Sequence, residues 1–204
     1  MRAISMALFV AALFAQAGVA RAASVDFAAS EVRGNSVVVT DLGPGLLAID
    51  PAFVSAAPID LIVILGSQDL GAPLAWNSLV DNLSGEVWRA FTVEVFGVIA
   101  LHAGSAVANA GAITGIDATA TAATLRFDPA EAAGIDLGAP FGVGENWSVD
   151  LGDLDSAAFR LRLAPLAVPE PTSLISIALG LVALGTFSKA TKATDSRNVP
   201  KTTL

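Results

Sequence analysis

Hydrophobic and polar residues alternate in three short runs of the chain, at 91–95, 147–151 and 159–163. Alternation with a period of two is typical of a β-strand that buries one face. Two continuous apolar runs, at 37–39 and 61–65, instead predict strands that are buried on both faces. The residues that we expect in the core include Phe91, Val93, Phe159, Leu161 and Leu163.

Turn-forming residues separate these runs, and no long amphipathic helix lies between them. The expected turns are Gly43-Pro44-Gly45, Gly66-Ser67, Asn82-Leu83-Ser84-Gly85 and Gly142-Val143-Gly144. Evenly spaced strands without helices predict an antiparallel β-sandwich of the jelly-roll or immunoglobulin-like kind over residues 23–165. Trp76, Trp88 and Trp147 fall on expected strands, and we expect them in the core rather than on a sugar-binding surface.

The Ala-rich segment 100–123 allows two interpretations. Its apolar residues change parity between Ala122 and Ala123, which predicts a β-bulge because one extra residue exchanges the two faces of a strand. The alternative is an Ala-rich helix over 100–110. Further along, Asp128 followed by Pro129 favours a short helical turn over 128–133, because proline suits the first helical position.

The N-terminal residues 1–22 have the pattern of a secretory signal peptide. Arg2 provides the positive charge, residues 3–17 are largely apolar, and Ala20 and Ala22 supply small side chains before the exit. This pattern predicts export through the Sec translocon and cleavage by signal peptidase before Ala23. Cleavage at Gly18-Val19-Ala20 is the alternative.

The C-terminal part contains three elements in a fixed order. A linker, 166–171, ends in Pro169-Glu170-Pro171, and an apolar segment, 172–190, follows it. As a helix its uncharged part, 172–187, would span about 24 Å at ~1.5 Å per residue, and running on to 190 lengthens it toward the ~30 Å hydrocarbon core. We therefore expect a transmembrane helix, with an ordinary anchor or a buried core helix as alternatives.

The tail that follows, 191–204, contains three of the four basic residues near the C-terminus, and the fourth lies just before it. The basic residues here are Lys189, Lys192, Arg197 and Lys201. With Asp195 they give a net charge of +3, which favours the cytoplasmic side of the membrane.

This order of Pro169, Glu170 and Pro171, apolar segment and basic tail resembles the sorting region of PEP-CTERM proteins. The resemblance covers roughly residues 168–192 and implies recognition by an exosortase, a membrane-embedded cysteine protease or transpeptidase. It departs from the family in one respect: the basic residues are spread and mixed with Ser, Thr and Asp, instead of forming a tight Arg-rich cluster. The resemblance further implies a place on the cell surface or in the extracellular matrix of a biofilm.

The composition of residues 23–168 excludes several classes of function. This span holds five basic residues, all of them Arg, against seventeen acidic ones, a net charge of −12. Such a surface repels nucleic acid. Cys is absent from the chain, which excludes thiol catalysis and Cys-ligated metals.

Candidate catalytic and metal-binding residues are few. His102 is the only histidine, and no nucleophile motif accompanies it, so we expect no catalysis from it and no zinc site. Gly43-Pro44-Gly45 fits a dinucleotide-binding glycine pattern, but Pro51 interrupts the helix that should follow, so turn glycines are the better interpretation. Asp150, Asp153 and Asp155 form the densest acidic group but lack the spacing of an EF-hand.

The resulting hypothesis is an exported, non-enzymatic structural or adhesive protein without a cofactor. Its expected partners are the Sec translocon, signal peptidase, an exosortase, the membrane and extracellular polysaccharide. The first alternative is a carbohydrate- or calcium-binding module, which would show exposed aromatic rows or a convergent acidic cluster. The second is a secreted hydrolase, which would need a paired set of carboxylates in a cleft.

Overall fold

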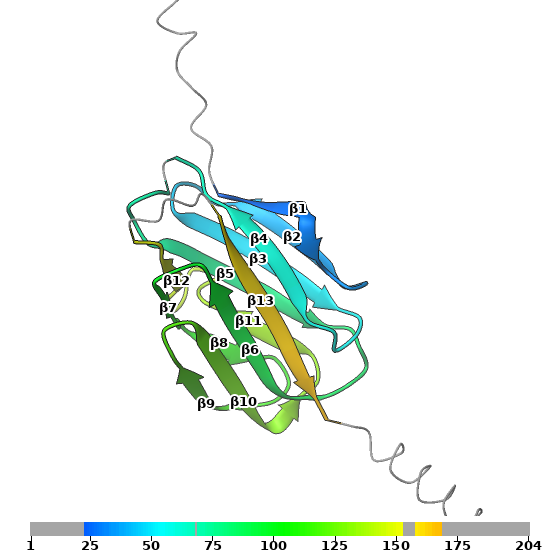
Figure 1. Ribbon diagram of the computed structural model, residues 1–204. Coiled ribbons are helices and arrows are strands. Elements are labelled where there is room, and N and C mark those ends of the chain that lie inside the picture. Colours follow the sequence, from blue (N-terminus) through cyan, green and yellow to red (C-terminus); the bar gives the residue numbers. More distant parts are fainter. Residues whose placement is uncertain (1–22, 68, 153–157, 169–204) are drawn as a thin grey trace, which may run out of the picture. The chain divides into compact units, whose positions relative to one another are not determined.

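The computed structural model describes residues 23–67, 69–152 and 158–168. These residues fold into thirteen β-strands arranged in two sheets, and they include no helix (Figure 1). The prediction of a mainly β domain with sandwich character is therefore confirmed. The signal peptide, the Pro169-Glu170-Pro171 motif, the apolar segment and the basic tail lie outside the described residues.

The first sheet has six strands in the order β1-β4-β13-β6-β10-β9, and all its pairs are antiparallel. Its strands are β1 Ser24–Glu31, β4 Ile59–Ile64, β13 Ala158–Ala167, β6 Trp88–Phe96, β10 Ala122–Glu131 and β9 Ile113–Ala118. The last of the described strands, β13, lies between β4 and β6 near the middle of this sheet.

The second sheet contains the strands in the order β2-β3-β5-β11-β8, with β12 joining β5 to β7. Its strands are β2 Ser36–Asp41, β3 Leu46–Phe53, β5 Leu74–Asn82, β11 Gly134–Leu137, β8 Ala106–Ala108, β12 Trp147–Asp150 and β7 Ala100–His102. One pair, β3 with β5, is parallel, and the other pairs of this sheet are antiparallel, so the described sheets are mainly antiparallel as expected. The chain can make this parallel pair because it leaves the second sheet after β3, forms β4 in the first sheet, and returns as β5.

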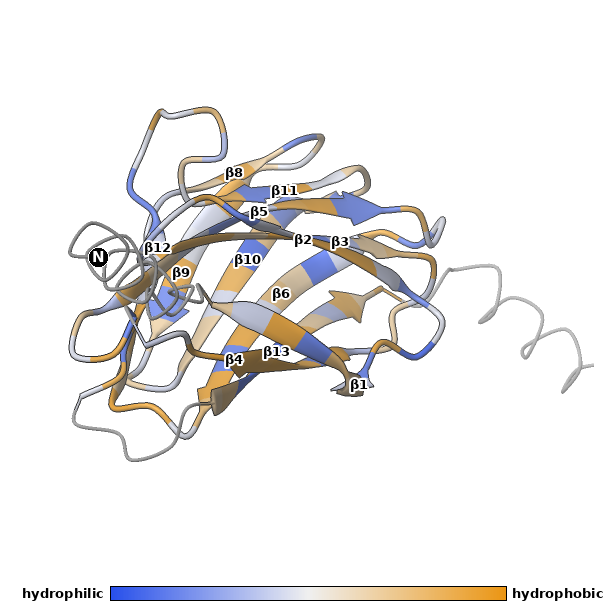
Figure 2. Cartoon of the chain, turned by 90° about the horizontal axis from the view of Figure 1, so that it is seen from above, coloured by the Kyte–Doolittle hydropathy of each residue, from blue (hydrophilic) through white to orange (hydrophobic). Residues whose placement is uncertain are grey.

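The core lies between the two sheets, which Figure 2 shows as separate layers. Phe91, Val93, Phe159, Leu161 and Leu163 are all buried, as the alternating runs predict. The three tryptophans are buried as well. Trp88 packs edge-on against Phe53, with ring centroids 5.5 Å apart, and Trp76 lies 5.6 Å from Trp147.

Two predicted strands are less buried than their composition indicates. Val38 in β2 is 62% exposed and Ile64 in β4 is 39% exposed, so neither strand is buried on both faces. The reason is their position. β2 is an edge strand, and the outer face of β4 belongs to the solvent side of the first sheet.

The Ala-rich segment forms neither a helix nor the predicted bulge. Residues 100–110 contain the short strands β7 and β8. The change of parity occurs because a hairpin connects β9 to β10, and Ala118 pairs directly with Ala123. The expected helical turn at 128–133 is also wrong, since β10 continues to Glu131 through a cis Asp128–Pro129 peptide.

Candidate functional site

The outer face of the first sheet carries a row of charged residues that the strand register brings together. Glu31 of β1 pairs with Asp60 of β4, Asp60 with Arg162 of β13, and Arg162 with Glu94 of β6. Directly opposite residues in an antiparallel pair point to the same face. Four residues that are far apart in the sequence therefore form one line of charged side chains across four strands, in which Arg162 lies between the carboxylates of Asp60 and Glu94.

A bulge in β1 opens a concavity beside this row. Between the pairs Asp26–Ile62 and Glu31–Asp60, β1 has four residues where β4 has one. The bulge has its own hydrogen bonds: Ala28 N–H donates to Asp26 Oδ1 at 3.0 Å, and Ser30 Oγ accepts from Ile62 N–H at 2.9 Å. Because Ser30 replaces a strand carbonyl, β1 stays attached to β4 while its backbone moves away from the ladder.

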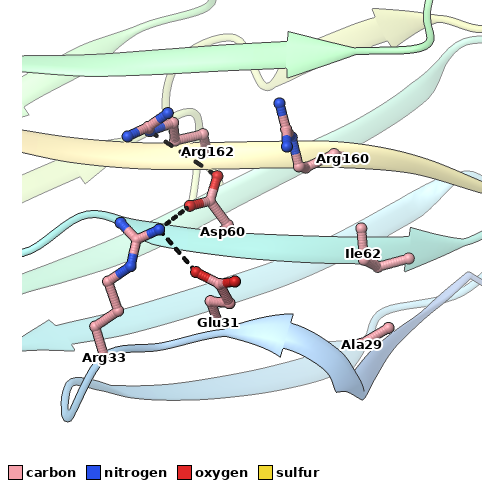
Figure 3. Close-up of a pocket in the computed structure, with 7 residues that line it drawn as sticks. All are labelled: Ala29, Glu31, Arg33, Asp60, Ile62, Arg160 and Arg162. Carbon is pink, nitrogen blue, oxygen red and sulfur yellow. Dashed lines mark hydrogen bonds and ion pairs between the residues drawn. The ribbon is translucent and has the colours of Figure 1, made fainter.

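The concavity has a volume of about 250 Å³. It is lined by Ala29, Glu31, Arg33, Asp60, Ile62, Arg160 and Arg162, which come from β1, β4, β13 and the turn after β1 (Figure 3). Three of the five basic residues of the acidic span 23–168 meet here.

Arg33 links the two carboxylates of this concavity. One of its terminal nitrogens, Nη2, lies 2.8 Å from Glu31 Oε2 and 3.0 Å from Asp60 Oδ2. The hydrogen bond to Glu31 raises the pKa of Arg33, the Asp60 charge adds to it, and partial desolvation opposes both, so the guanidinium remains charged. Arg33 has a φ of 51° in the turn that ends β1, and buried Asn35 fixes this turn by accepting from Val54 N–H at 3.0 Å.

Arg160 has a different environment from the other arginines of the concavity. Its guanidinium carbon lies 4.0 Å from the centroid of the Phe96 ring, a cation–π arrangement. On β13 it stands between Ile62 and Phe96, its partners on the neighbouring strands. Within the described part of the chain, no carboxylate forms an ion pair with it. Its N–H groups are therefore not committed to a carboxylate of the described residues.

Only one of the two carboxylate oxygens of Asp60 accepts a hydrogen bond. Its side chain is 13% exposed, and its Oδ2 accepts from Arg33. Its Oδ1 is buried and receives no hydrogen bond, because the nearest cation, Arg162 Nε, is 3.9 Å away. A buried acceptor without a donor is costly, so Asp60 occupies this row at the expense of stability.

A second buried carboxylate, Glu131, lies at the end of β10 and is fully enclosed. Its Oε2 accepts from Gly111 N–H at 2.7 Å and from Ala110 N–H at 3.0 Å. Its Oε1 accepts from Ala133 N–H at 2.7 Å and from Gly134 N–H at 2.9 Å. Desolvation pushes the pKa of Glu131 upward, but these backbone donors outweigh it and lower the pKa below its ordinary value.

Glu131 is a structural residue. It joins the connection between β8 and β9 to the connection between β10 and β11, and it faces no opening to solvent. Gly134 also serves this junction, since its φ is 141° and a side chain there would collide with the carbonyl oxygen of Val80. No ligand could reach Glu131 without displacing these connections.

The candidate residues from the sequence do not converge on either site. His102 lies at the end of β7 and is exposed. Gly43 and Gly45 form the turn between β2 and β3, with φ values of 119° and 72°, so they are turn glycines as predicted. Asp150 ends β12, whereas Asp153 and Asp155 lie outside the described residues. Across the ranges that the structure describes, no group of three or more His, Asp or Glu is placed to hold a metal ion.

Sequence reasoning placed Arg160 and Arg162 only as outward residues of the last strand and did not single out Glu31, Arg33 or Asp60. One signal was present, because basic residues are rare in the acidic span and two of them share a face of one strand. The register that joins β1, β4 and β13 was needed to connect them.

A comparison with protein-family models, with curated proteins and with solved structures finds no match to this chain. In the part of the chain that the structure describes, no helix has the length and apolar character to cross a membrane.

Proposed function

We propose that this is an exported structural or adhesive protein of the cell surface or extracellular matrix, which an exosortase sorts through its C-terminal region. One observation carries the proposal: Pro169-Glu170-Pro171, an uncharged apolar segment and a basic tail follow a β-sandwich in that order. The signal-peptide pattern of residues 1–22 supports the same route.

The described domain supports a role that requires no catalysis. In the concavity, Glu31 and Asp60 share the same nitrogen of Arg33, so neither is a free acid or base in the way that a glycosidase pair must be. We further propose a jelly-roll type of sandwich, because β13 inserts between β4 and β6 and thereby interleaves the two ends of the chain within one sheet.

The sorting proposal is tested by the mass and both termini of the mature protein in membrane, surface and culture fractions. We expect Ala23 at the N-terminus and a new C-terminus between Pro169 and Thr172. Combined replacement Pro169→Ala and Glu170→Ala should leave a membrane species that is heavier by the mass of residues 172–204. If the wild-type protein keeps Leu204 in its final location, the apolar segment is only an anchor and the exosortase proposal is wrong.

A further inference from the structure

We infer that the concavity between β1, β4 and β13 binds a carboxylated sugar residue, a uronate unit of an acidic polysaccharide. This inference rests on the proposed surface location, where such polymers occur outside the cell. It assigns a ligand to Arg160 and Glu31, which the sorting proposal leaves without a role.

Arg160 supplies the site for the carboxylate. Stacking on Phe96 fixes the plane of the guanidinium while leaving its edge free to donate. Arginine donates to a carboxylate through two parallel N–H groups, which gives both strength and orientation. Arg33 and Arg162 cannot serve equally, because Arg33 contacts Glu31 and Asp60, and Arg162 lies 3.9 Å from both Asp60 and Glu94.

Glu31 supplies the site for a hydroxyl group. Its side chain lines the concavity and is 68% exposed, and its carboxylate has acceptor sites beyond the one that Arg33 uses. Glu31 and Arg162 both pair with Asp60, whereas Arg160 pairs with Ile62, so Glu31 and Arg160 lie in adjacent outward rows of the sheet. Rows two residues apart are separated by about 6.6 Å along the strands. A sugar ring that carries a carboxylate at one end and hydroxyls at the other can lie between these two side chains.

Size and charge restrict the ligand further. At about 250 Å³, the concavity is smaller than the ~300–1,000 Å³ of sites for drug-sized molecules, so it suits one sugar unit. Ala29 and Ile62 provide apolar surface for the C–H face of the ring. The net charge of −12 over residues 23–168 disfavours a polyanion of higher charge density, such as a sulfated polymer, more strongly than a uronate with one charge per unit.

The test is binding of the full-length protein, purified in detergent, to polygalacturonate, to galacturonate and to neutral galactan, measured by calorimetry. We expect binding of polygalacturonate, weaker binding of the monomer and none of galactan. Arg160→Gln should weaken binding about tenfold or more, because it removes a charge-assisted hydrogen-bonding group. The matched control is Arg126→Gln on β10 of the same sheet, where Arg126 is exposed and pairs with Asp117 at 2.7 Å. Its affinity should stay within about twofold of the wild type.

Several results would overturn the inference. These are no binding of polygalacturonate by the folded wild-type protein, equal binding of dextran sulfate, or equal weakening by Arg126→Gln. Thermal unfolding of each variant identifies loss of fold, and Arg160→Lys, which retains the charge but lacks the fork, provides a second variant that should also bind more weakly. C-terminal processing is measured in parallel on the wild-type protein and on Arg160→Gln. If the wild type is processed normally but does not bind polygalacturonate, the ligand is rejected and the sorting proposal stands. If the wild type binds polygalacturonate but is not processed, the sorting proposal is rejected and the ligand stands.

Discussion

Asp60 and Glu131 are both carboxylates that folding largely removes from water, but different kinds of donor stabilise them. Glu131 accepts from four backbone N–H groups, which are fixed by the connections that they belong to. Asp60 depends on the side chains of Arg33 and Arg162, and one of its oxygens has no donor. A carboxylate with fixed backbone donors holds the fold, whereas the partners of one that is held by half-exposed side chains can move away from it.

The strongest challenge to this comparison is the substitution Glu131→Gln. An amide keeps the size of the side chain but turns one acceptor into a donor that faces backbone N–H groups. Each buried N–H that loses its partner costs ~1–3 kcal/mol, so we expect a loss of about 3 kcal/mol or more in the free energy of unfolding, measured by urea denaturation.

The matched control for this substitution is Glu145→Gln in the exposed loop between β11 and β12. It should change the free energy of unfolding by less than about 0.5 kcal/mol. Equal effects of the two substitutions would show that the backbone donors around Glu131 do not contribute to the free energy of unfolding.

Acid sensitivity is the second and smaller effect. The pKa of Glu131 is lowered in the folded state, so its contribution is present above the unfolded value of about 4.3 and is lost as the pH falls through the lowered folded value. Each unit of lowering corresponds to about 1.4 kcal/mol. Unfolding measured between pH 7 and pH 2 should therefore show a steeper loss of stability in the wild type than in Glu131→Gln. Parallel curves would contradict the lowered pKa.

A third, smaller effect is expected from Asp60→Asn. Arg33 is 37% exposed and Arg162 36% exposed, so water can solvate both when their partner is neutralised. Ion pairs at such positions contribute ~0–1 kcal/mol, and we expect a loss of at most about 1 kcal/mol in urea denaturation. A loss as large as that of Glu131→Gln would show that Asp60 also holds the fold.

The smallest expected effect is the influence of salt on the differences in the free energy of unfolding between the wild type and the two variants, Asp60→Asn and Glu131→Gln. Raising the ionic strength from about 0.1 M to 1 M shortens the screening length from ~10 Å to ~3 Å. The stability difference between wild type and Asp60→Asn should shrink by a few tenths of a kcal/mol, because those charges are near the surface. The stability difference between wild type and Glu131→Gln should stay constant, because Glu131 is enclosed. Urea denaturation at the two salt concentrations measures both differences. A salt-dependent difference for Glu131→Gln with a constant difference for Asp60→Asn would contradict the distinction between the two carboxylates.

Local patterns in the sequence predict which strands bury one face, but they do not predict which strands are neighbours. The alternation of Phe159, Leu161 and Leu163 with Arg160 and Arg162 is visible along the chain, and the burial of these residues follows it. The mistaken bulge near Ala123 has the same origin, because a hairpin and a bulge both change parity and only the pairing distinguishes them.

The candidate site escapes sequence reasoning for a related reason. Glu31, Asp60 and Arg162 meet because β13 lies beside β4, and β4 beside β1, which is a property of the whole topology. The bulge of β1 cannot be recognised from its residues alone either, since Asp26 and Ser30 look like ordinary outward polar residues until their bonds to Ala28 and Ile62 are seen.

The central position of β13 also determines the order in which the protein can be made. This strand ends at Ala167 and is the last of the described strands, yet β4 and β6 are joined only through it. Until it has been synthesised, β1 with β4 and β6 with β10 are separate fragments that expose unpaired edges. The nascent chain therefore cannot complete the first sheet until nearly all of the described domain has been translated.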